Sequence, residues 1–167
     1  LADTAVNELP TAAISADVAV QTAAFVRQLG INPRVAAVSF ATFGNREVNV
    51  AAQQSAVIAE LDRRGVDFEY DGEMEADVAL DANLLRLYPF ARLSRPANVL
   101  LMPALHSASI ASKLLRQLGG GQVIGPILIG LAKAAQIVPM NAGVSDLINL
   151  GAIGAFQSLA ADANRSA

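Results

Sequence analysis

The chain has 167 residues and a net charge of −3, with 53% hydrophobic and 16% charged residues. This length fits one domain, and the apolar excess favours a fold that is buried on several sides or an oligomer. Aromatic residues make up 5% and there is no basic tract, so nucleic-acid binding is not expected. No apolar run reaches the roughly 18 residues of a spanning helix, so we expect no membrane partner.

Cysteine and histidine set further limits. The chain has no cysteine, which excludes disulfides and thiol chemistry, and one histidine, His106, which excludes a two-histidine metal site. The first residues lack the basic region and apolar core of a signal peptide. Because Leu1 is not an initiator methionine, we interpret the chain as a piece of a larger protein, with a frayed tail at 162–167.

Apolar periodicity predicts alternating helices and strands from the beginning of the chain. Residues 14–29 form a helical stripe that ends at a glycine. Residues 35–40 form a short continuous apolar run, which is typical of a parallel strand covered on both faces. Residues 50–64 are again helical and end at a glycine, and residues 68–71 predict a second strand.

The second half continues the alternation. A short helix, a strand over residues 98–102 and a helix with an apolar stripe over residues 110–118 are expected. Three glycines then end that helix, residues 126–130 (PILIG) predict a buried strand, and residues 144–159 a long helix. The order predicts an α/β fold with a mainly parallel sheet, in a single domain over residues 1–167.

Ligands of open α/β sheets bind outside the carboxyl ends of the strands. The segments of interest are therefore the loops after the predicted strands and the glycine-rich segment 119–133. There, Gly125 and Gly130 have the separation found in a phosphate-binding loop, but Leu-Ala-Lys stands where Gly-Lys-Ser/Thr is required. We favour a helix terminator followed by a buried strand.

Charged residues near these loops each have a functional and a structural interpretation. Asp71, Glu73, Glu75 and Asp77 alternate, so on an extended strand they would share one face that could bind Mg²⁺. A solvated acidic strand end is the favoured alternative. His106, at a predicted helix start, could serve as an acid or base, but an exposed histidine is favoured.

Five segments, taken together, resemble the second half of phosphate acetyltransferases. They occur in the family's order and cover nearly the whole chain: residues 1–12 (LADTAVNELPTA), 34–45 (RVAAVSFATFGN), 71–80 (DGEMEADVAL), 88–133 (YPFARLSRPANVLLMPALHSASIASKLLRQLGGGQVIGPILIGLAK) and 144–155 (VSDLINLGAIGA). Within them, SFATFGN, GEMEAD and YPFARLSRPANVL are most similar to the acetyltransferase-like domain at the C-terminus of bacterial NADP-dependent malic enzymes.

The resemblance implies a three-layer α/β/α fold, of which this chain would be mainly the second domain. Family members move an acetyl group between acetyl phosphate and CoA in a cleft between two domains, without an essential metal or histidine. In the malic enzymes, malate oxidation belongs to an N-terminal part, so NADP and a divalent metal are expected only there. Acetyl-CoA is then the ligand expected for this chain, which needs no cofactor of its own.

The resemblance also indicates which polar positions have changed. Active members carry a Ser-Arg pair before the last helix, where the arginine binds phosphoryl oxygens. Here Pro139 and Met140 take those two places, and methionine cannot donate a hydrogen bond. In the earlier loop, Phe43 replaces a lysine and Asn45 a serine, and two serines replace an asparagine and a tyrosine before Lys113. The positions that the resemblance assigns to an acetyl-CoA or phosphate cleft are Thr42, Gly44, Asn45, Lys113, Gly125, Pro126, Gly130, Met140 and Asp146.

Two of these positions also have a purely structural interpretation. Asp146 lies in the first turn of a predicted helix, where the dipole favours a carboxylate, and Lys113 would be solvent-exposed. With no catalytic residue retained, we expect a non-catalytic, acetyl-CoA-binding regulatory domain of a cytoplasmic malic enzyme. Its partners would be the N-terminal part of the same chain and further copies in a homo-oligomer. The alternatives are an active phosphate acetyl- or butyryltransferase, and a scaffold without ligand.

Overall fold

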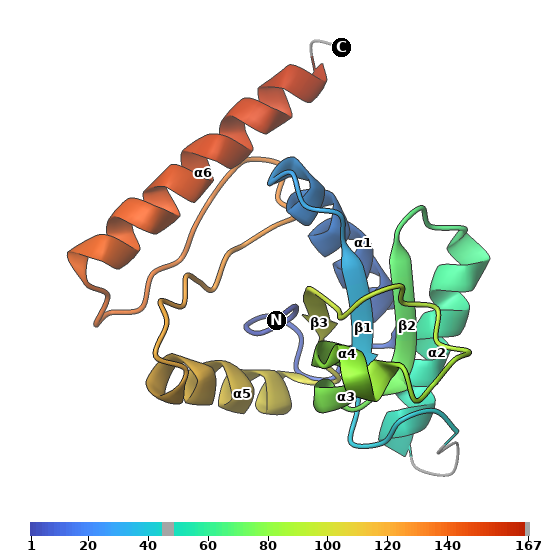
Figure 1. Ribbon diagram of the computed structural model, residues 1–167. Helices are drawn as coiled ribbons and strands as arrows, with labels where there is room; N and C mark the ends of the chain where they lie inside the picture. Colours follow the sequence, from blue (N-terminus) through green and yellow to red (C-terminus); the bar gives the residue numbers. More distant parts are fainter. Residues whose placement is uncertain (45–48, 166–167) are drawn as a thin grey trace. The chain divides into compact units, whose positions relative to one another are not determined.

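The computed structural model describes residues 1–44 and 49–165. The contacts divide the chain into two compact units, Leu1–Lys113 and Leu114–Ala167. The elements, labelled in Figure 1, are α1 (Ala12–Gln28), β1 (Arg34–Val38), α2 (Asn49–Arg64), β2 (Glu69–Met74), α3 (Ala76–Leu80), α4 (Ala82–Leu85), β3 (Val99–Leu101), α5 (Leu105–Leu118) and α6 (Val144–Arg165).

The sheet of the first unit has three parallel strands in the order β2-β1-β3, which confirms the predicted α/β fold with a parallel sheet. Val35 of the central strand β1 pairs with Tyr70 of β2 and with Val99 of β3. Ala2 runs beside β3, because its N–H donates to the carbonyl of Leu100 at 2.8 Å. The apolar residues of β1 are all buried, as expected for a strand covered on both faces.

Gly72 allows β1 and β2 to approach each other at the point where their register shifts. It lies opposite Ala37, after which Val38 pairs with Met74. A Cβ atom on residue 72 would lie 2.6 Å from the carbonyl oxygen of Ala37, and the backbone φ is +147°. Glycine is therefore required here both for space and for conformation. The irregularity leaves two consecutive side chains, those of Glu73 and Met74, buried.

Local signals define α1. The Thr11 hydroxyl accepts a hydrogen bond from the N–H of Ile14 at 3.3 Å, which caps the first turn. Gly30 follows the helix with φ +78°, a conformation that glycine adopts readily. The predicted end of this helix at a glycine is thus confirmed. The buried face consists only of small side chains, those of Ser15, Ala16, Ala19 and Ala23.

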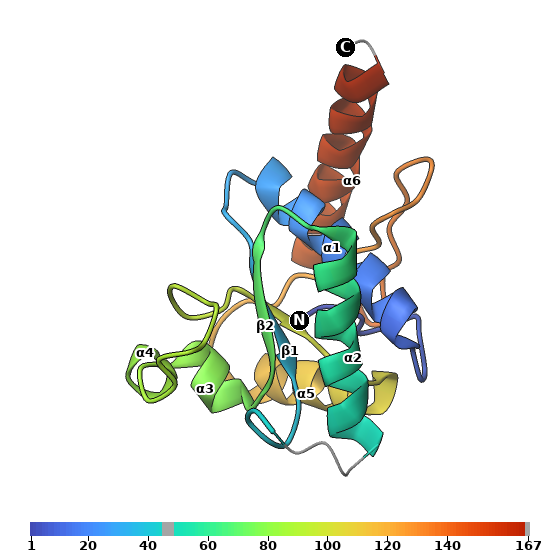
Figure 2. The same ribbon diagram turned by 90° about the vertical axis from the view of Figure 1, so that its right-hand side faces the viewer.

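Helices cover both faces of the sheet, as Figure 2 shows for β1 and β2. Helices α1 and α2 lie on one face, over a core that consists of Ala2, Ala16, Ala19, Val35, Val57, Leu61, Val99 and Leu101. The other face carries α3, α4 and the start of α5, over a core that consists of Ala36, Val38, Met74, Val78, Ala79, Leu85, Leu93, Ala97, Met102 and Ala108. The first unit therefore has the expected three layers.

The second unit begins in the last turns of α5. The N–H of Gly119 donates to the carbonyl of Leu115 at 2.9 Å, and Gly120 has φ +61°, so the glycines end the helix as predicted. Residues 119–143, all of them described, contain neither helix nor strand, so the strand predicted at 126–130 is wrong. α6 then runs to Arg165, which includes most of the expected tail; residues 166 and 167 lie outside the described residues.

Side-chain amides bind the backbone of Leu128, in the middle of the PILIG segment. The N–H of Leu128 donates to Oε1 of Gln136 at 3.0 Å, and the Leu128 carbonyl accepts from Nε2 of Gln136 at 3.1 Å and of Gln157 at 2.9 Å. These bonds satisfy the two backbone groups of Leu128, which in a sheet would pair with a neighbouring strand. Among the described helices, none has both the length and the apolar character needed to cross a bilayer.

Candidate functional site

The carboxyl ends of the three parallel strands lie at one edge of the sheet, where ligands of α/β folds bind. Three loops leave this edge. Residues 39–44 follow β1, Glu75 connects β2 to α3, and residues 102–104 connect β3 to α5. Figure 1 shows β1 and β2 pointing toward the same end of the sheet. Two of the predicted site residues, Thr42 and Gly44, belong to the first of these loops.

Thr42 and Gly44 are both bound by carboxylates from the end of β2. The Thr42 hydroxyl donates to Oε2 of Glu75 at 3.2 Å and accepts from the Glu75 N–H at 3.0 Å. The N–H of Gly44 donates to Oε1 of Glu73 at 2.9 Å, while Oε2 of Glu73 accepts from the Ser55 hydroxyl on α2. The loop after β1 is therefore connected to the end of β2 through Glu73 and Glu75, which the sequence suggested only as Mg²⁺ ligands or as part of a solvated strand end.

Phe43 lies between these two residues and belongs to an aromatic cluster. Its ring centroid is 5.6 Å from that of Tyr88 and 5.1 Å from that of Phe90, and the latter two rings are 6.1 Å apart. Edge-to-face contacts at such distances are favourable. Phe43, at the position where active members have a lysine by resemblance, thus packs on the α4–β3 connection.

The four acidic residues around β2 do not share one face. Asp71 and Glu73 are 4% and 2% exposed, so a solvated acidic strand end is wrong for both, whereas Glu75 and Asp77 are exposed. Asp71 accepts the backbone N–H of Arg92 at 2.6 Å, and burial raises its pKa. Within the described residues, no three histidine or acidic side chains are placed to share a metal ion, so the Mg²⁺ hypothesis has no support.

Two buried polar atoms beside β1 lack a hydrogen-bond partner in the described part of the chain. They are Oγ of Ser39 and Oε1 of Gln54. The other end of the Gln54 amide is fixed, because Nε2 donates to the carbonyl of Val38 at 3.1 Å. Such orphaned groups are uncommon in folded proteins. Both atoms lie inside the fold, so they add no hydrogen-bonding surface that is open to solvent.

Helix α5 carries the predicted His106 and Lys113. His106 is exposed in the first turn, as favoured from the sequence. Lys113 is also exposed, and its Nζ atom donates to the Ser109 hydroxyl at 2.9 Å, one turn earlier. Ser109 stands where the resemblance has an asparagine. The lysine is therefore available to solvent, with a local hydrogen bond that orients it along the helix.

The remaining predicted residues belong to the second unit. Gly125 has φ +136° and is followed by a cis peptide bond to Pro126, and its carbonyl accepts from the Arg116 guanidinium at 2.9 Å. Gly130 has φ +76°. These residues shape an irregular backbone rather than frame a strand. They provide no charged group of their own.

Met140, just before α6, and Asp146, in its first turn, have different surroundings. The Met140 side chain is fully exposed, and a thioether is at most a weak acceptor. Asp146 accepts the N–H of Gly143 through Oδ2 at 3.0 Å, so the carboxylate reaches back to cap its own helix. The structural interpretation of Asp146 is thus observed in the second unit.

Thr42 and Gly44 lie in the same loop of the first unit, whereas the Gly125–Pro126 turn, Met140 and Asp146 belong to the second unit. Asn45 lies outside the described residues. Sequence reasoning missed the two glutamates as partners of the loop, and it missed the aromatic cluster. The alternating acidic residues beside a predicted strand end did indicate that Glu73 and Glu75 matter. Their role could not be predicted, because it depends on the donors of Thr42 and Gly44 in a different loop.

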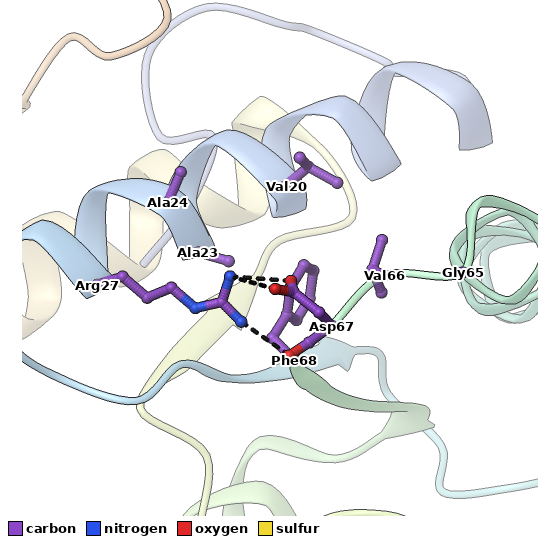
Figure 3. Close-up of a pocket in the computed structure, with 8 residues that line it drawn as sticks. All are labelled: Val20, Ala23, Ala24, Arg27, Gly65, Val66, Asp67 and Phe68. Carbon is purple, nitrogen blue, oxygen red and sulfur yellow. Dashed lines mark hydrogen bonds and ion pairs between the residues drawn. The ribbon is translucent and has the colours of Figure 1, made fainter. Parts of the chain in front are cut away.

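A shallow pocket of about 200 Å³ lies at the opposite edge of the sheet, between α1 and the α2–β2 connection. Figure 3 shows Arg27 at its side, with hydrogen bonds to Oδ1 of Asp67 at 2.8 Å and to the Asp67 carbonyl at 2.8 Å. Its other lining residues are mostly apolar. The pocket lies near the amino end of β2, whereas the candidate loops lie at the carboxyl ends of the strands. It includes none of the predicted site residues.

Comparison with known proteins identifies the class of the chain. The model of the family Phosphate acetyl/butaryl transferase matches residues 1–155, and the chain belongs to this family. A phosphotransacetylase from Streptococcus pyogenes superimposes with a TM-score of 0.83 at 30% identity, covering 95% of this chain and 48% of that one. The EutD phosphotransacetylase from Staphylococcus aureus gives a TM-score of 0.84 at 27% identity, covering 93% and 49%.

Sequence relatives include two kinds of protein. An NADP-dependent malic enzyme from Rhizobium meliloti is 52% identical over 158 residues, which cover 95% of this chain and 21% of the relative. A phosphate acetyltransferase from Clostridium acetobutylicum is 32% identical over 159 residues, which cover 94% of this chain and 48% of the relative. The chain thus spans about a fifth of the malic enzyme and about half of the acetyltransferase.

Proposed function

We propose that this chain is the acetyltransferase-like domain of an NADP-dependent malic enzyme, that it lacks acyltransferase activity, and that it binds acetyl-CoA as a regulatory ligand. The higher identity to the malic enzyme than to the acetyltransferase, 52% against 32%, supports this branch of the family. NADP, a divalent metal and malate oxidation would belong to the rest of such a protein, in the cytoplasm.

The observation that carries the proposal is Met140. By resemblance it stands where active members have an arginine for phosphoryl oxygens, and its exposed thioether offers no hydrogen-bond donor. Removing one positioned donor from an oxyanion site typically lowers kcat by about 10²–10³. Pro139 next to it lacks both a hydroxyl group and a backbone N–H. A site without these donors would hold a thioester more readily than it would stabilise an acyl-transfer transition state.

A regulatory role further requires that acetyl-CoA binds with different affinity to two states of the whole protein. Exposed apolar side chains support association of several copies. On α5, Ile110 and Leu118 are 60% and 79% exposed; on α6, Ile148 is 66% exposed. Apolar side chains exposed at helical spacing are typical of surfaces that another chain covers. Self-association is therefore part of the proposal.

An active phosphate acetyl- or butyryltransferase is the second candidate. Matches to phosphate acetyltransferases over 94% of the chain favour it, as do the retained Thr42, Gly44 and Lys113. In that case another cation of the intact protein would replace the missing arginine.

Acetyl phosphate turnover distinguishes the two candidates. We expect the intact parent protein to show no CoA-dependent turnover, and Met140→Arg to introduce it. The matched control is Ile137→Arg, which adds the same charge at another exposed apolar position three residues earlier. Robust turnover by the unmodified protein would exclude the regulatory proposal in favour of the active enzyme.

Binding of acetyl-CoA separates a regulatory domain from a scaffold. Calorimetric titration of the intact protein should give saturable heat, and the melting temperature should rise with ligand concentration. The rate of malate oxidation should change over the same concentration range. If acetyl-CoA produced neither heat nor a shift in melting temperature, the scaffold interpretation would replace the regulatory one.

A further inference from the structure

Strand β2 forms a lateral edge of the sheet, since among the described residues it pairs with β1 alone. An edge strand has backbone groups that a strand of another chain could pair with, so proteins cover such edges or place charges on them. At the opposite lateral edge, Ala2 pairs with Leu101 of β3. Along β2, the cover is the connection between α4 and β3, which passes beside the strand (Figure 1).

Carboxylates of β2 bind the backbone of this connection. The N–H of Arg92 donates to Oδ2 of Asp71 at 2.6 Å, and the N–H of Ser94 donates to Oε2 of Glu69 at 2.8 Å. The two segments run antiparallel, because the later residue of the connection binds the earlier residue of the strand. Leu93, between the two donors, is buried in the core that α3 and α4 cover. The connection therefore lies on the face of β2 that is opposite α1 and α2.

The side chain of Arg92 reaches from that face to the other one. Tyr70 packs on the core beneath α1 and α2, on the face opposite Asp71, because successive side chains of a strand alternate. The Arg92 guanidinium carbon lies 5.7 Å from the centre of the Tyr70 ring, and its nitrogens donate to both oxygens of Asp62 on α2, at 2.6 and 3.3 Å. The Tyr70 hydroxyl donates to the same carboxylate at 2.6 Å. Arg92 therefore spans the edge of the sheet, from Asp71 on one face to Asp62 on the other.

We propose that Arg92 closes the lateral edge of the sheet and prevents β2 from pairing with a strand of another copy of the chain. Its charged side chain lies where a pairing strand would have to approach, and charges at an edge oppose such pairing. Asp62 and Tyr70 keep the guanidinium there through an ion pair and a cation–π contact. One backbone donor of β2 is also occupied, because the N–H of Gly72 donates to Oδ1 of Asp71 at 2.9 Å. The inference is independent of the proposed function, since none of the predicted site residues takes part.

Sedimentation velocity of the intact protein tests the inference through Arg92→Ala. The side chains of Arg92 and Asp62 are 50% and 44% exposed, and ion pairs this exposed contribute little to stability, so the variant should fold and melt close to the unmodified protein. We expect it to associate beyond the state of the unmodified protein, increasingly so at higher concentration. In the associated form, hydrogen exchange over residues 69–74 should be slower by about five- to tenfold.

Arg63→Ala is the matched control. Arg63 lies on α2, is 71% exposed and donates its side-chain hydrogen bonds to Glu60, so its loss changes the net charge equally without opening the edge. Arg92→Lys keeps a positive charge beside β2 and should associate no more than the unmodified protein. Association of either of these variants to the same extent as Arg92→Ala would overturn the inference, because loss of a charge at the edge would then not be the cause.

Asp62→Asn keeps the test decisive if Arg92→Ala folds poorly. It leaves the arginine in place but weakens its anchor on α2, so it should give the same association and the same slowing over residues 69–74, to a smaller extent. If neither variant associates more than the unmodified protein, the edge of β2 does not need Arg92 and the inference is wrong. Association that leaves hydrogen exchange over residues 69–74 unchanged would also overturn it, because another surface would then be responsible.

Discussion

Gly72 provides the most direct test of how the sheet positions the loop after β1. Replacing it by alanine places a Cβ atom 2.6 Å from the carbonyl oxygen of Ala37 and 2.9 Å from the Ala37 Cβ, so the two strands have to separate. Overpacking of this kind costs about 1–3 kcal/mol. Holding alanine at φ +147° costs about a further 1–3 kcal/mol. We therefore expect Gly72→Ala to destabilise the fold by about 2–6 kcal/mol.

Gly65→Ala is the matched control for Gly72→Ala. Gly65 also has positive φ, +62°, but a Cβ atom there would meet no other atom within 4 Å. Its substitution therefore carries only the conformational cost, about 1–2 kcal/mol. Urea denaturation of the 167-residue chain, followed by circular dichroism, measures both variants against the unmodified chain.

A local measurement connects this prediction to the site. Glu73 follows Gly72, so separation of the strands should displace its carboxylate from the N–H of Gly44. Hydrogen exchange at Gly44 should accelerate in Gly72→Ala and remain unchanged in Gly65→Ala. If Gly72→Ala lost no more stability than Gly65→Ala, the close approach of β1 and β2 would not be limiting, and the reasoning would be refuted.

Three further predictions concern the core, a charge cluster and the second unit. Leu101→Ala, at a fully buried position of β3, should cost about 2–5 kcal/mol by urea denaturation; a smaller loss would mean that the core closes over the cavity. Hydrogen bonds from two neighbouring arginines lower the pKa of Glu60 from 4.5 to about 2, so its stabilising effect is complete above pH 4.5 and is lost as the pH falls through about 2. Glu60→Gln should therefore flatten the acid limb of a stability–pH curve, and an unchanged limb would contradict this. Gln136→Leu removes both hydrogen bonds to the backbone of Leu128 and should lower the local opening free energy there by about 1–2 kcal/mol; unchanged hydrogen exchange at Leu128 would show that the amide is dispensable.

Much of the fold follows from local signals in the sequence. The continuous apolar run in β1 predicted a strand buried on both faces, and glycines at positions 30 and 65 marked the ends of α1 and α2. The PILIG segment has an equally strong apolar pattern but forms no strand. In its middle, the backbone partners of Leu128 are glutamine side chains 8 and 29 residues away. A pattern of apolar residues does not encode such partners.

The site was predictable only in part, because its polar contacts are long-range. Thr42 and Gly44 could be located in a loop after a strand, where α/β folds place their ligands. Glu73 and Glu75, which accept their hydrogen bonds, lie 29 and 33 positions later in the chain. This pairing depends on the register between β1 and β2. The acidic alternation suggested a shared face, but the shift opposite Ala37 buries Glu73 and leaves Glu75 outside. The acidic residue types marked these positions as candidates, but the strand register determined which carboxylate is buried and which is exposed.

The small side chains on the buried face of α1 bear on where the protein is able to move. Ser15, Ala16, Ala19 and Ala23 have no long side chain that could adopt another rotamer in response to strain. A displacement of α1 would therefore move the strands and α2 with it, since packed protein interiors respond to strain by discrete shifts. At the carboxyl ends of the strands, exposed side chains such as those of Glu75 and His106 can change rotamer without repacking the core. Side-chain adaptation to a ligand should consequently involve such exposed residues, while α1 and the sheet serve as the fixed reference frame.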